Sequence, residues 1–325
     1  DRSWGQDFPW NEVRRAQSRG ALVGVVVYDL IPIEHPEFIE AGLRIPFRDW
    51  WNRVERTADF LVTISRSVVD DIARIQRGRP KVERQNRPLP MRAFTLGAKL
   101  DGTTADQAIR PELLTLMDSA VPGGVYLMVG TVTSRKGHAL ALEACERIWA
   151  AGGDARLVIA GKNGCAGDAL VDRIRQHPRL GERVFWFDDL NDAELSWCFR
   201  QASALITASQ AEGFNLPIVE ALSHGCPVFA SDLPVHREVG GEFATYFPAG
   251  DPAALARLIT DHPRQPRRQS QTSLPGFRWP DWNESCESLL KAVLELAQQV
   301  KPECSPQADL RAQATPAPVR PRSAA

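Results

Sequence analysis

The stretch Ser209-Gln210-Ala211-Glu212-Gly213-Phe214-Asn215-Leu216-Pro217-Ile218-Val219-Glu220-Ala221 decides both the fold and the candidate site of this chain. The apolar run at 203–208 just before it is short, which is typical of a buried parallel strand. Pro217 suits the first turn of a helix, where its missing N–H costs nothing. Gly225 and Pro227 predict the end of that helix. The stretch therefore predicts a strand, a tight glycine-containing loop and a helix.

Two carboxylates flank the start of this predicted helix. Glu212 lies in the loop at the carboxyl end of the strand, and Glu220, eight residues later, lies one turn into the helix. A helix start offers unpaired N–H groups and the positive end of the helix dipole, which suits a phosphate. The two carboxylates can therefore hold two parts of one extended ligand. Taken alone, the pair also fits a helix cap and a solvated carboxylate.

A second charged loop, residues 130–137, follows another predicted strand at 125–129. Arg135 offers a planar fork of donors and Lys136 a point charge, and both suit a diphosphate. Gly130 and Gly137 allow a close approach of the backbone. Alone, the loop equally fits two solvated cations. Its strand and the strand before Glu212 are predicted to be central neighbours, so the two loops together predict a diphosphate site.

Composition narrows the class of protein. The chain has 325 residues, of which 43% are apolar and 24% charged, and two soluble domains are expected. A net charge of −1 gives no sign of a nucleic-acid partner. The sequence contains no run of 18 apolar residues that would span a membrane. The six cysteines lack C-x-x-C spacing, which favours reduced thiols in a cytoplasmic protein over a zinc site.

The pattern of strands and helices differs between the two parts of the chain. Residues 1–20 show no periodic pattern. A buried parallel strand is expected at 21–28 and further strands at 59–64 and 91–96, with helices at 48–58 and 65–76. From residue 124 to 262 strands and helices alternate regularly with short loops, which predicts a doubly wound parallel sheet. Ligands bind such sheets at the carboxyl ends of the strands.

The segment from Glu212 to Ala221, Glu-Gly-Phe-Asn-Leu-Pro-x-x-Glu-Ala, resembles the E-x7-E motif of retaining glycosyltransferases of the GT-B fold, in the family 4 group of bacterial cell-surface sugar transferases. The Arg-Lys-Gly of the 130–137 loop is similar to a loop of that family. Residues 28–32, Tyr-Asp-Leu-Ile-Pro, resemble its His-Asp-Leu-x-Pro segment. The resemblance covers roughly residues 21–300.

The resemblance implies an α/β, GT-B-like architecture of two Rossmann-like doubly wound parallel-sheet domains, the first one incomplete. Residues 1–101 form a partial acceptor-side domain and 102–123 a linker. The nucleotide-sugar-binding domain spans 124–262, a linker and returning helix span 263–301, and residues 302–325 form a disordered tail. Because the first domain is expected to lack its opening strands, we expect the chain to bind its donor, to transfer the sugar slowly or not at all, and to self-associate through residues 21–100.

The implied activity is that of a retaining hexosyltransferase. It moves a sugar from a nucleotide diphosphate sugar, with GDP-mannose as the first guess, to a glycan or lipid-linked glycan in surface polysaccharide biosynthesis. No metal and no cofactor are expected. The expected location is cytoplasmic, with peripheral contact at the inner face of the membrane. Two alternatives stay open, a sugar-nucleotide epimerase of the same fold and a non-catalytic nucleotide-sugar-binding remnant.

The resemblance also assigns roles to residues. Glu212, Arg135 and Lys136 carry catalysis, with Glu212 binding hydroxyls of the donor sugar. Glu220 accepts hydrogen bonds from the ribose. The remaining expected donor-binding residues are Gly130, Gly213, Phe214, Asn215, Leu216, Tyr28 and Asp29. Tyr28 departs from the family's histidine, and Asn215 replaces a common glycine at a position where Asn tolerates unusual backbone angles.

Overall fold

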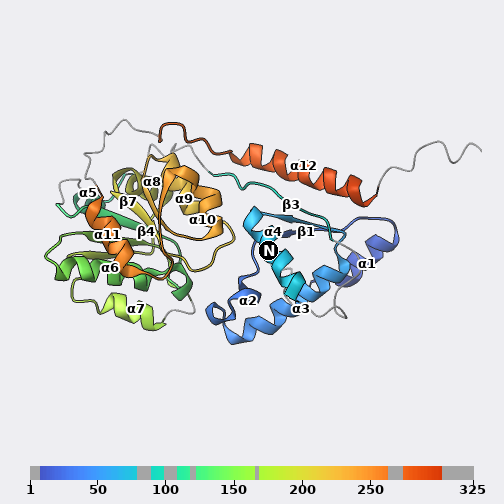
Figure 1. The fold of residues 1–325 in the computed structure, drawn as a ribbon, viewed down its shortest axis with the longest axis horizontal. Coiled ribbons are helices and arrows are strands. Elements are labelled where there is room, and N and C mark those ends of the chain that lie inside the picture. The colour runs from blue at the N-terminus through green and yellow to red at the C-terminus, as the bar shows by residue number, and fades with distance from the viewer. Residues whose placement is uncertain are drawn as a thin grey trace, which may run out of the picture.

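The computed structural model describes residues 8–78, 89–98, 108–117, 122–164, 168–262 and 274–301. These form two lobes, each built on a parallel sheet (Figure 1). The predicted disordered tail at 302–325 lies outside the described residues, as do residues 102–107 and 118–121 of the predicted linker at 102–123. The proposed domain boundaries therefore stay predictions.

The larger sheet has six parallel strands in the order β6-β5-β4-β7-β8-β9. Their bounds are β4 (Val125–Val129), β5 (Arg156–Ala160), β6 (Val184–Phe187), β7 (Ala204–Thr207), β8 (Val228–Ser231) and β9 (Ala244–Phe247). The strand order runs outward from β4 in one direction and then outward from β7 in the other. β4 and β7, although distant in sequence, pair directly, with Tyr126 opposite Ala204. Ligands of such sheets bind where the order reverses, which here is between β4 and β7.

Helices cover both faces of this sheet because its strands are apolar on both sides. The helices are α6 (His138–Ala150), α7 (Asp168–Arg175), α8 (Asp192–Gln201), α9 (Leu216–Ser223), α10 (Pro234–Gly240) and α11 (Pro252–Asp261). Alternate strand residues pack on opposite faces. Leu157 joins the core with α6, α7 and α11, whereas Val158 joins the core with α8, α9 and α10.

The smaller sheet has three parallel strands in the order β1-β2-β3, namely β1 (Gly24–Val27), β2 (Phe60–Thr63) and β3 (Met91–Ala93). The prediction that its first strand is buried was wrong for most of β1. Val26 is 37% exposed, and only Val27 is fully buried. The reason is position: within the described residues β1 pairs only with β2, so one edge and part of one face remain open. An apolar run does not reveal where in a sheet its strand lies.

The helices of the first lobe are α1 (Trp10–Ser18), α2 (Ile31–Glu34), α3 (Ala41–Thr57) and α4 (Arg66–Gly78), with a short turn of 3-10 helix at Pro36–Phe38. The sequence did not predict α1, since it buries no residue of its own. A long-range contact anchors it, because Gln17 Nε2 donates to the Thr57 carbonyl at 2.8 Å. Helix α5 (Pro111–Leu116) lies on the second lobe (Figure 1), where Leu113 and Leu116 are buried in the core.

The last helix, α12 (Trp282–Val300), lies along the first lobe and packs on β2 and β3 (Figure 1). Before it, Trp279 Nε1 donates to the Leu96 carbonyl at 2.8 Å, which ties the returning chain to the first lobe. Ala292 and Leu296 of this helix are buried, whereas Leu290 is exposed. The apolar residues at 289–296 therefore do not all lie on the face of α12 that packs against the sheet.

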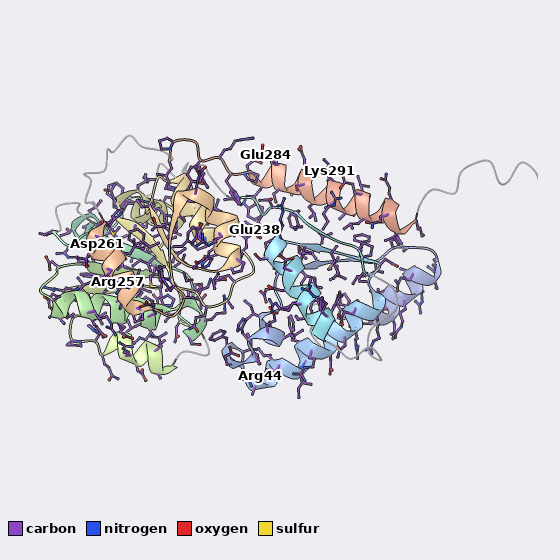
Figure 2. All side chains as sticks on the ribbon, in the orientation of Figure 1. Arg44, Glu238, Arg257, Asp261, Glu284 and Lys291 are labelled. Atoms are coloured by element: carbon purple, nitrogen blue, oxygen red, sulfur yellow. The ribbon has the colours of Figure 1, made fainter. Side chains whose placement is uncertain are left out.

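Two contacts join the lobes near the end of β7. Ser65 Oγ donates to the Gly213 carbonyl at 2.7 Å. Glu238 on α10 accepts hydrogen bonds from the backbone N–H of Arg66 at 2.7 Å and of Ser67 at 2.9 Å. Figure 2 shows Glu238 at this meeting of α10 and α4. A carboxylate at a helix start is favoured by the helix dipole, so this hydrogen bonding stabilises the contact between the lobes.

Candidate functional site

The loops after β4 and β7 meet at the point where the strand order reverses. Lys136 Nζ lies 2.6 Å from Glu212 Oε1, and Arg135 Nη1 lies 2.8 Å from Glu212 Oε2. Arg135 Nη1 also donates to the Ala211 carbonyl at 2.5 Å. The structure thus brings together the two loops that the sequence singled out. The sequence did not predict that the two cations would pair directly with Glu212.

Glu212 is a buried, ionised carboxylate. Its side chain is only 7% exposed. Burial raises the pKa of this carboxyl, but Lys136 and Arg135 more than offset that effect and hold the pKa below its usual value. Ser209 Oγ donates to Glu212 Oε1 at 2.8 Å, a contact that no sequence signal indicated. The carboxylate is therefore fixed in place before any ligand arrives.

The first lobe meets this loop closely, at Gly213. A Cβ at Gly213 would lie 2.2 Å from the Tyr28 carbonyl oxygen, so no larger residue fits without moving one of the lobes. The glycine of the Glu-Gly-Phe segment is thus required by the contact between lobes. The Tyr28 side chain itself points out and is 57% exposed, so at this position the backbone of Tyr28 shapes the loop.

Asp29 lies beside Tyr28 at the carboxyl end of β1 and faces the charged cluster of the second lobe. Burial raises the pKa of its carboxyl, with the Ile31 amide and Arg135 acting in the opposite direction. Asp29 and Glu212 line the same hollow of about 140 Å³ between the lobes. The other residues that line it are Leu30, Ile31, Glu34, His35, Ser67, Asp71, Arg74, Gln210, Ala211, Leu233, Pro234 and Val235.

Asn215 has a left-handed backbone, with φ 84° and ψ 66°, and precedes the first residue of α9. No other non-glycine residue in the described ranges has a positive φ. Its side chain is buried and donates from Nδ2 to Thr207 Oγ1 at 2.7 Å. The tolerance of unusual backbone angles that the sequence suggested for Asn215 is confirmed.

Glu220 lies in different surroundings, on the side of α9 toward α8. Burial raises the pKa of its carboxyl, and the nearby carboxylate of Asp192 adds to the increase. Asp192 begins α8, directly after the loop 188–191. No ion pair of Glu220 is present among the described residues. Glu220 therefore lies beside the start of α8 and the loop that precedes it.

The remaining predicted donor-binding residues line or support the same edge of the sheet. Gly130 directly follows β4, and the side-chain stem of Lys136 passes over it. Leu216 is the first residue of α9. The Phe214 ring turns inward and packs edge-on against Trp279, with ring centroids 5.9 Å apart. Phe214 can thus offer a ligand its backbone but not its ring.

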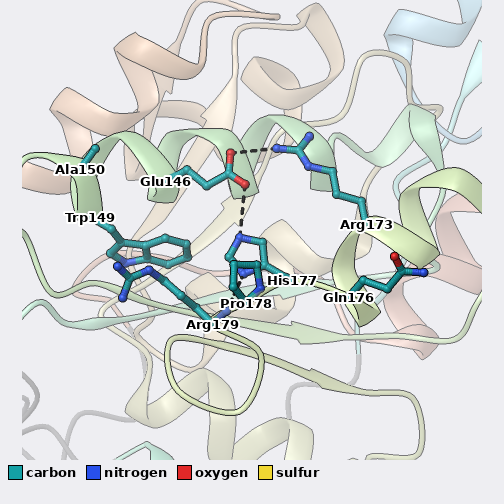
Figure 3. A pocket seen from close by; sticks show the side chains of 8 residues that line it. All are labelled: Glu146, Trp149, Ala150, Arg173, Gln176, His177, Pro178 and Arg179. Carbon is teal, nitrogen blue, oxygen red and sulfur yellow. Dashed lines mark hydrogen bonds and ion pairs between the residues drawn. The ribbon is translucent and has the colours of Figure 1, made fainter.

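A second hollow, of about 590 Å³, lies between α6 and the segment after α7 (Figure 3). Its charged groups are already paired, since Glu146 binds Arg173 at 2.9 Å and contacts His177 at 3.2 Å. It is lined by the last turn of α6, which lies toward the amino ends of the strands. Because ligands bind these sheets at the opposite edge, the hollow between the lobes is the better candidate site.

The described ranges contain neither a cluster of metal ligands nor a helix that could span a membrane. No group of three or more His, Cys, Asp or Glu side chains there is arranged to hold a metal ion. No described helix combines the length and the apolar character that crossing a bilayer requires.

The chain is similar in sequence to known glycosyltransferases. Residues 120–273 match the family described as "Glycosyl transferases group 1". The chain is 32% identical over 294 residues to the serotype-specific mannosyltransferase WbdA of Escherichia coli, covering 89% of this chain and 36% of the relative. It is 34% identical over 129 residues to a phosphatidyl-myo-inositol mannosyltransferase of Mycobacterium leprae, covering 38% and 33%. The chain spans about a third of the length of these curated relatives.

Solved structures show the same architecture at low sequence identity. HepE of Anabaena, crystallised with UDP and glucose, aligns with a TM-score of 0.64 at 17% identity over 89% of this chain and 76% of its own. Sucrose-phosphate synthase of Thermosynechococcus elongatus aligns with a TM-score of 0.59 at 18% identity, covering 89% and 70%. The fold is therefore GT-B-like, as the sequence predicted.

Proposed function

We propose that this chain transfers a mannosyl group from GDP-mannose to a hydroxyl of a surface glycan, with retention at the anomeric carbon. The premise of this proposal is that residues 120–273 are a domain of the glycosyl transferases group 1 family. The names of the relatives, WbdA foremost, support mannose as the sugar. The proposed retention rests on the resemblance of the Glu212–Glu220 segment to the E-x7-E motif.

One observation carries the proposal. At the reversal point between β4 and β7, the buried carboxylate of Glu212 pairs with two cations and also lines the hollow between the lobes. A nucleotide diphosphate sugar needs cations for its diphosphate and acceptors for its hydroxyls. Both are present here, side by side and at the sheet edge where ligands bind.

The cations would stabilise the leaving group. When the bond between the anomeric carbon and the diphosphate oxygen breaks, negative charge builds on the diphosphate. Arg135, Lys136 and the first N–H groups of α9 would stabilise that charge electrostatically. The acceptor oxygen bonds to the anomeric carbon on the face that the diphosphate leaves, and its proton passes to a diphosphate oxygen.

The two carboxylates would hold opposite ends of the donor. Glu212 accepts hydrogen bonds from hydroxyls of the sugar, and Asp29 faces the same end from the first lobe. Glu220 accepts hydrogen bonds from the ribose, and the loop before α8 lies beside the base. No protein group in this scheme forms a covalent intermediate, and no metal is required.

A panel of nucleotide diphosphate sugars tests the function. GDP-mannose, UDP-glucose, ADP-glucose and dTDP-glucose are screened by thermal shift, and release of the nucleotide diphosphate is then followed with a mannose oligosaccharide as acceptor. We expect GDP-mannose to give the largest shift and the oligosaccharide to gain one mannose. An epimer formed from donor alone would assign the chain to sugar-nucleotide epimerisation. No shift with any donor would remove the proposal.

A further inference from the structure

His236 is completely buried beneath the loop that carries Glu212, although the proposed reaction does not use it. It belongs to α10, and its two ring nitrogens face different partners. Nε2 lies 2.8 Å from Asn215 Nδ2, and Nδ1 lies 2.8 Å from the Ser231 carbonyl. A carbonyl can only accept, so Nδ1 carries the proton and Nε2 is the acceptor.

This tautomer fixes the orientation of the Asn215 amide. Its NH₂ group donates one hydrogen to His236 Nε2 and the other to Thr207 Oγ1. If the amide were turned over, its oxygen would face the lone pair of Nε2. The buried ring therefore holds the Asn215 side chain in one position. The Asn215 side chain adopts this position together with a left-handed backbone. A left-handed backbone costs free energy for any residue other than glycine.

The same network reaches the other end of the loop. Ser231 Oγ donates to the Ser209 carbonyl at 2.6 Å, and Ser209 Oγ donates to Glu212. Both ends of the 209–215 loop are thus tied to β8 and α10 by buried hydrogen bonds. Buried networks of this kind specify a single arrangement when every member has a partner.

We propose that His236 is a positioning residue that holds Asn215 in its left-handed conformation, and so sets where the Glu212 loop and the start of α9 meet the donor. The predicted effect of His236 on donor binding rests on the proposed function. Its predicted effect on the conformation of the loop does not. Glycine adopts the left-handed region without help. An Asn215→Gly variant should therefore no longer need His236.

The test is a double-mutant cycle with His236→Ala and Asn215→Gly. We expect H236A to weaken binding of GDP-mannose about tenfold, the worth of one buried hydrogen bond, in calorimetric titrations. In the N215G background the same substitution should cost less than about twofold. An equal loss in both backgrounds, or no loss in either, would overturn the proposal.

The matched control is His177→Ala, which removes another mostly buried, hydrogen-bonded histidine far from the cleft. It should lower the unfolding temperature without changing affinity. If H236A fails to fold, Asn215→Ala replaces it, since alanine lacks both the side-chain bonds and the freedom of glycine. N215A should lose affinity and N215G should keep it, and equal behaviour of the two would contradict the proposal.

Amide hydrogen exchange of residues 209–219, measured without ligand, separates this inference from the proposed function. H236A should speed exchange in this segment when Asn215 is present and add nothing in the N215G background. That result would support the positioning role even if GDP-mannose did not bind. Unchanged exchange in both backgrounds would refute it whatever the donor is.

Discussion

Glu212 and Glu220 lie eight residues apart on the same loop and helix, yet their electrostatic surroundings are opposite. Glu212 is held by Lys136 and Arg135, and its pKa is lowered. Glu220 is buried beside Asp192, and its pKa is raised. A symmetrical sequence motif thus encodes two different sites.

This difference indicates which contacts exist before the donor binds. At the Glu212 end the protein supplies its own counter-charges, so the carboxylate is already satisfied. At the Glu220 end no described cation balances the charge, so hydroxyl donors from a ligand would relieve an existing cost. The comparison predicts that substitutions at the two ends change stability in opposite directions.

The largest effect is expected from Lys136→Met. It leaves the buried Glu212 with one cation instead of two, which should lower the free energy of unfolding by about 3 kcal/mol. Loss of a charge-assisted bond to the diphosphate should weaken GDP binding about 10- to 100-fold. Urea denaturation and calorimetry measure the two quantities. Lys291→Met, on the exposed face of α12, is the control, and equal behaviour of both variants would remove Lys136 from the site.

The next effect is that of Glu212→Gln. Affinity for GDP-mannose should fall about tenfold because a carboxylate acceptor for the sugar is lost. Affinity for GDP should hold or increase, since both cations become free for the diphosphate. Calorimetry with the two ligands separates these outcomes. A similar loss for GDP would show that Glu212 does not act on the sugar.

Glu220→Gln should give the opposite pattern. Affinity for GDP and GDP-mannose should fall by the same factor, about fivefold, because the ribose is common to both. Without ligand the variant should be more stable than the parent at pH 7, with a midpoint higher by about 2 °C. A less stable variant would mean that Glu220 has a protein partner on which the fold depends.

The two carboxyls also predict opposite dependences on pH. The lowered pKa of Glu212 means that its stabilising contribution is complete above the unfolded value of 4.5 and is lost as pH falls through its folded pKa. The raised pKa of Glu220 means that its cost grows as pH rises from 4.5 through its folded pKa. Urea titrations of both Gln variants between pH 3 and 8 should therefore converge on the parent in acid.

Glu238→Gln should give the smallest effect. It tests whether loss of any carboxylate between the lobes lowers ligand affinity, or only loss of Glu212 or Glu220. Glu238 accepts from the N–H groups that begin α4, so its replacement should cost about 1 kcal/mol of stability. Affinity for both ligands should stay within about twofold. If affinity for GDP-mannose fell as much as in the Glu212 variant, the loss of affinity would have to come from a weaker contact between the lobes.

Sequence patterns predicted the second lobe well, because its strands are buried on both faces and its helices follow at short intervals. Strand β4 at Val125–Val129, for example, was predicted with its observed bounds. The first lobe was predicted less well. Helix α1 buries no residue of its own, and β1 lies at an edge, so neither has a pattern that reveals its place.

At the candidate site the sequence predicted the charged residues but not their supports. Spacing placed Glu212 and the Arg135-Lys136 pair at adjacent strand ends. The contact of Gly213 with Tyr28 and the burial of His236 under Asn215 depend on residues far apart in the chain. Such contacts follow from the packing of the lobes and of β8 against the loop, for which a single sequence carries no local signal.

The central claim is that one donor spans the site from Glu212 to Glu220 at the reversal point of the sheet. Hydrogen–deuterium exchange with and without GDP-mannose tests it most directly. We expect protection at 130–137 and 209–222 with either GDP or GDP-mannose, and at 28–31 only when the sugar is present. Protection confined to the hollow between α6 and the segment after α7, at residues 146–150 and 173–179, would contradict the account.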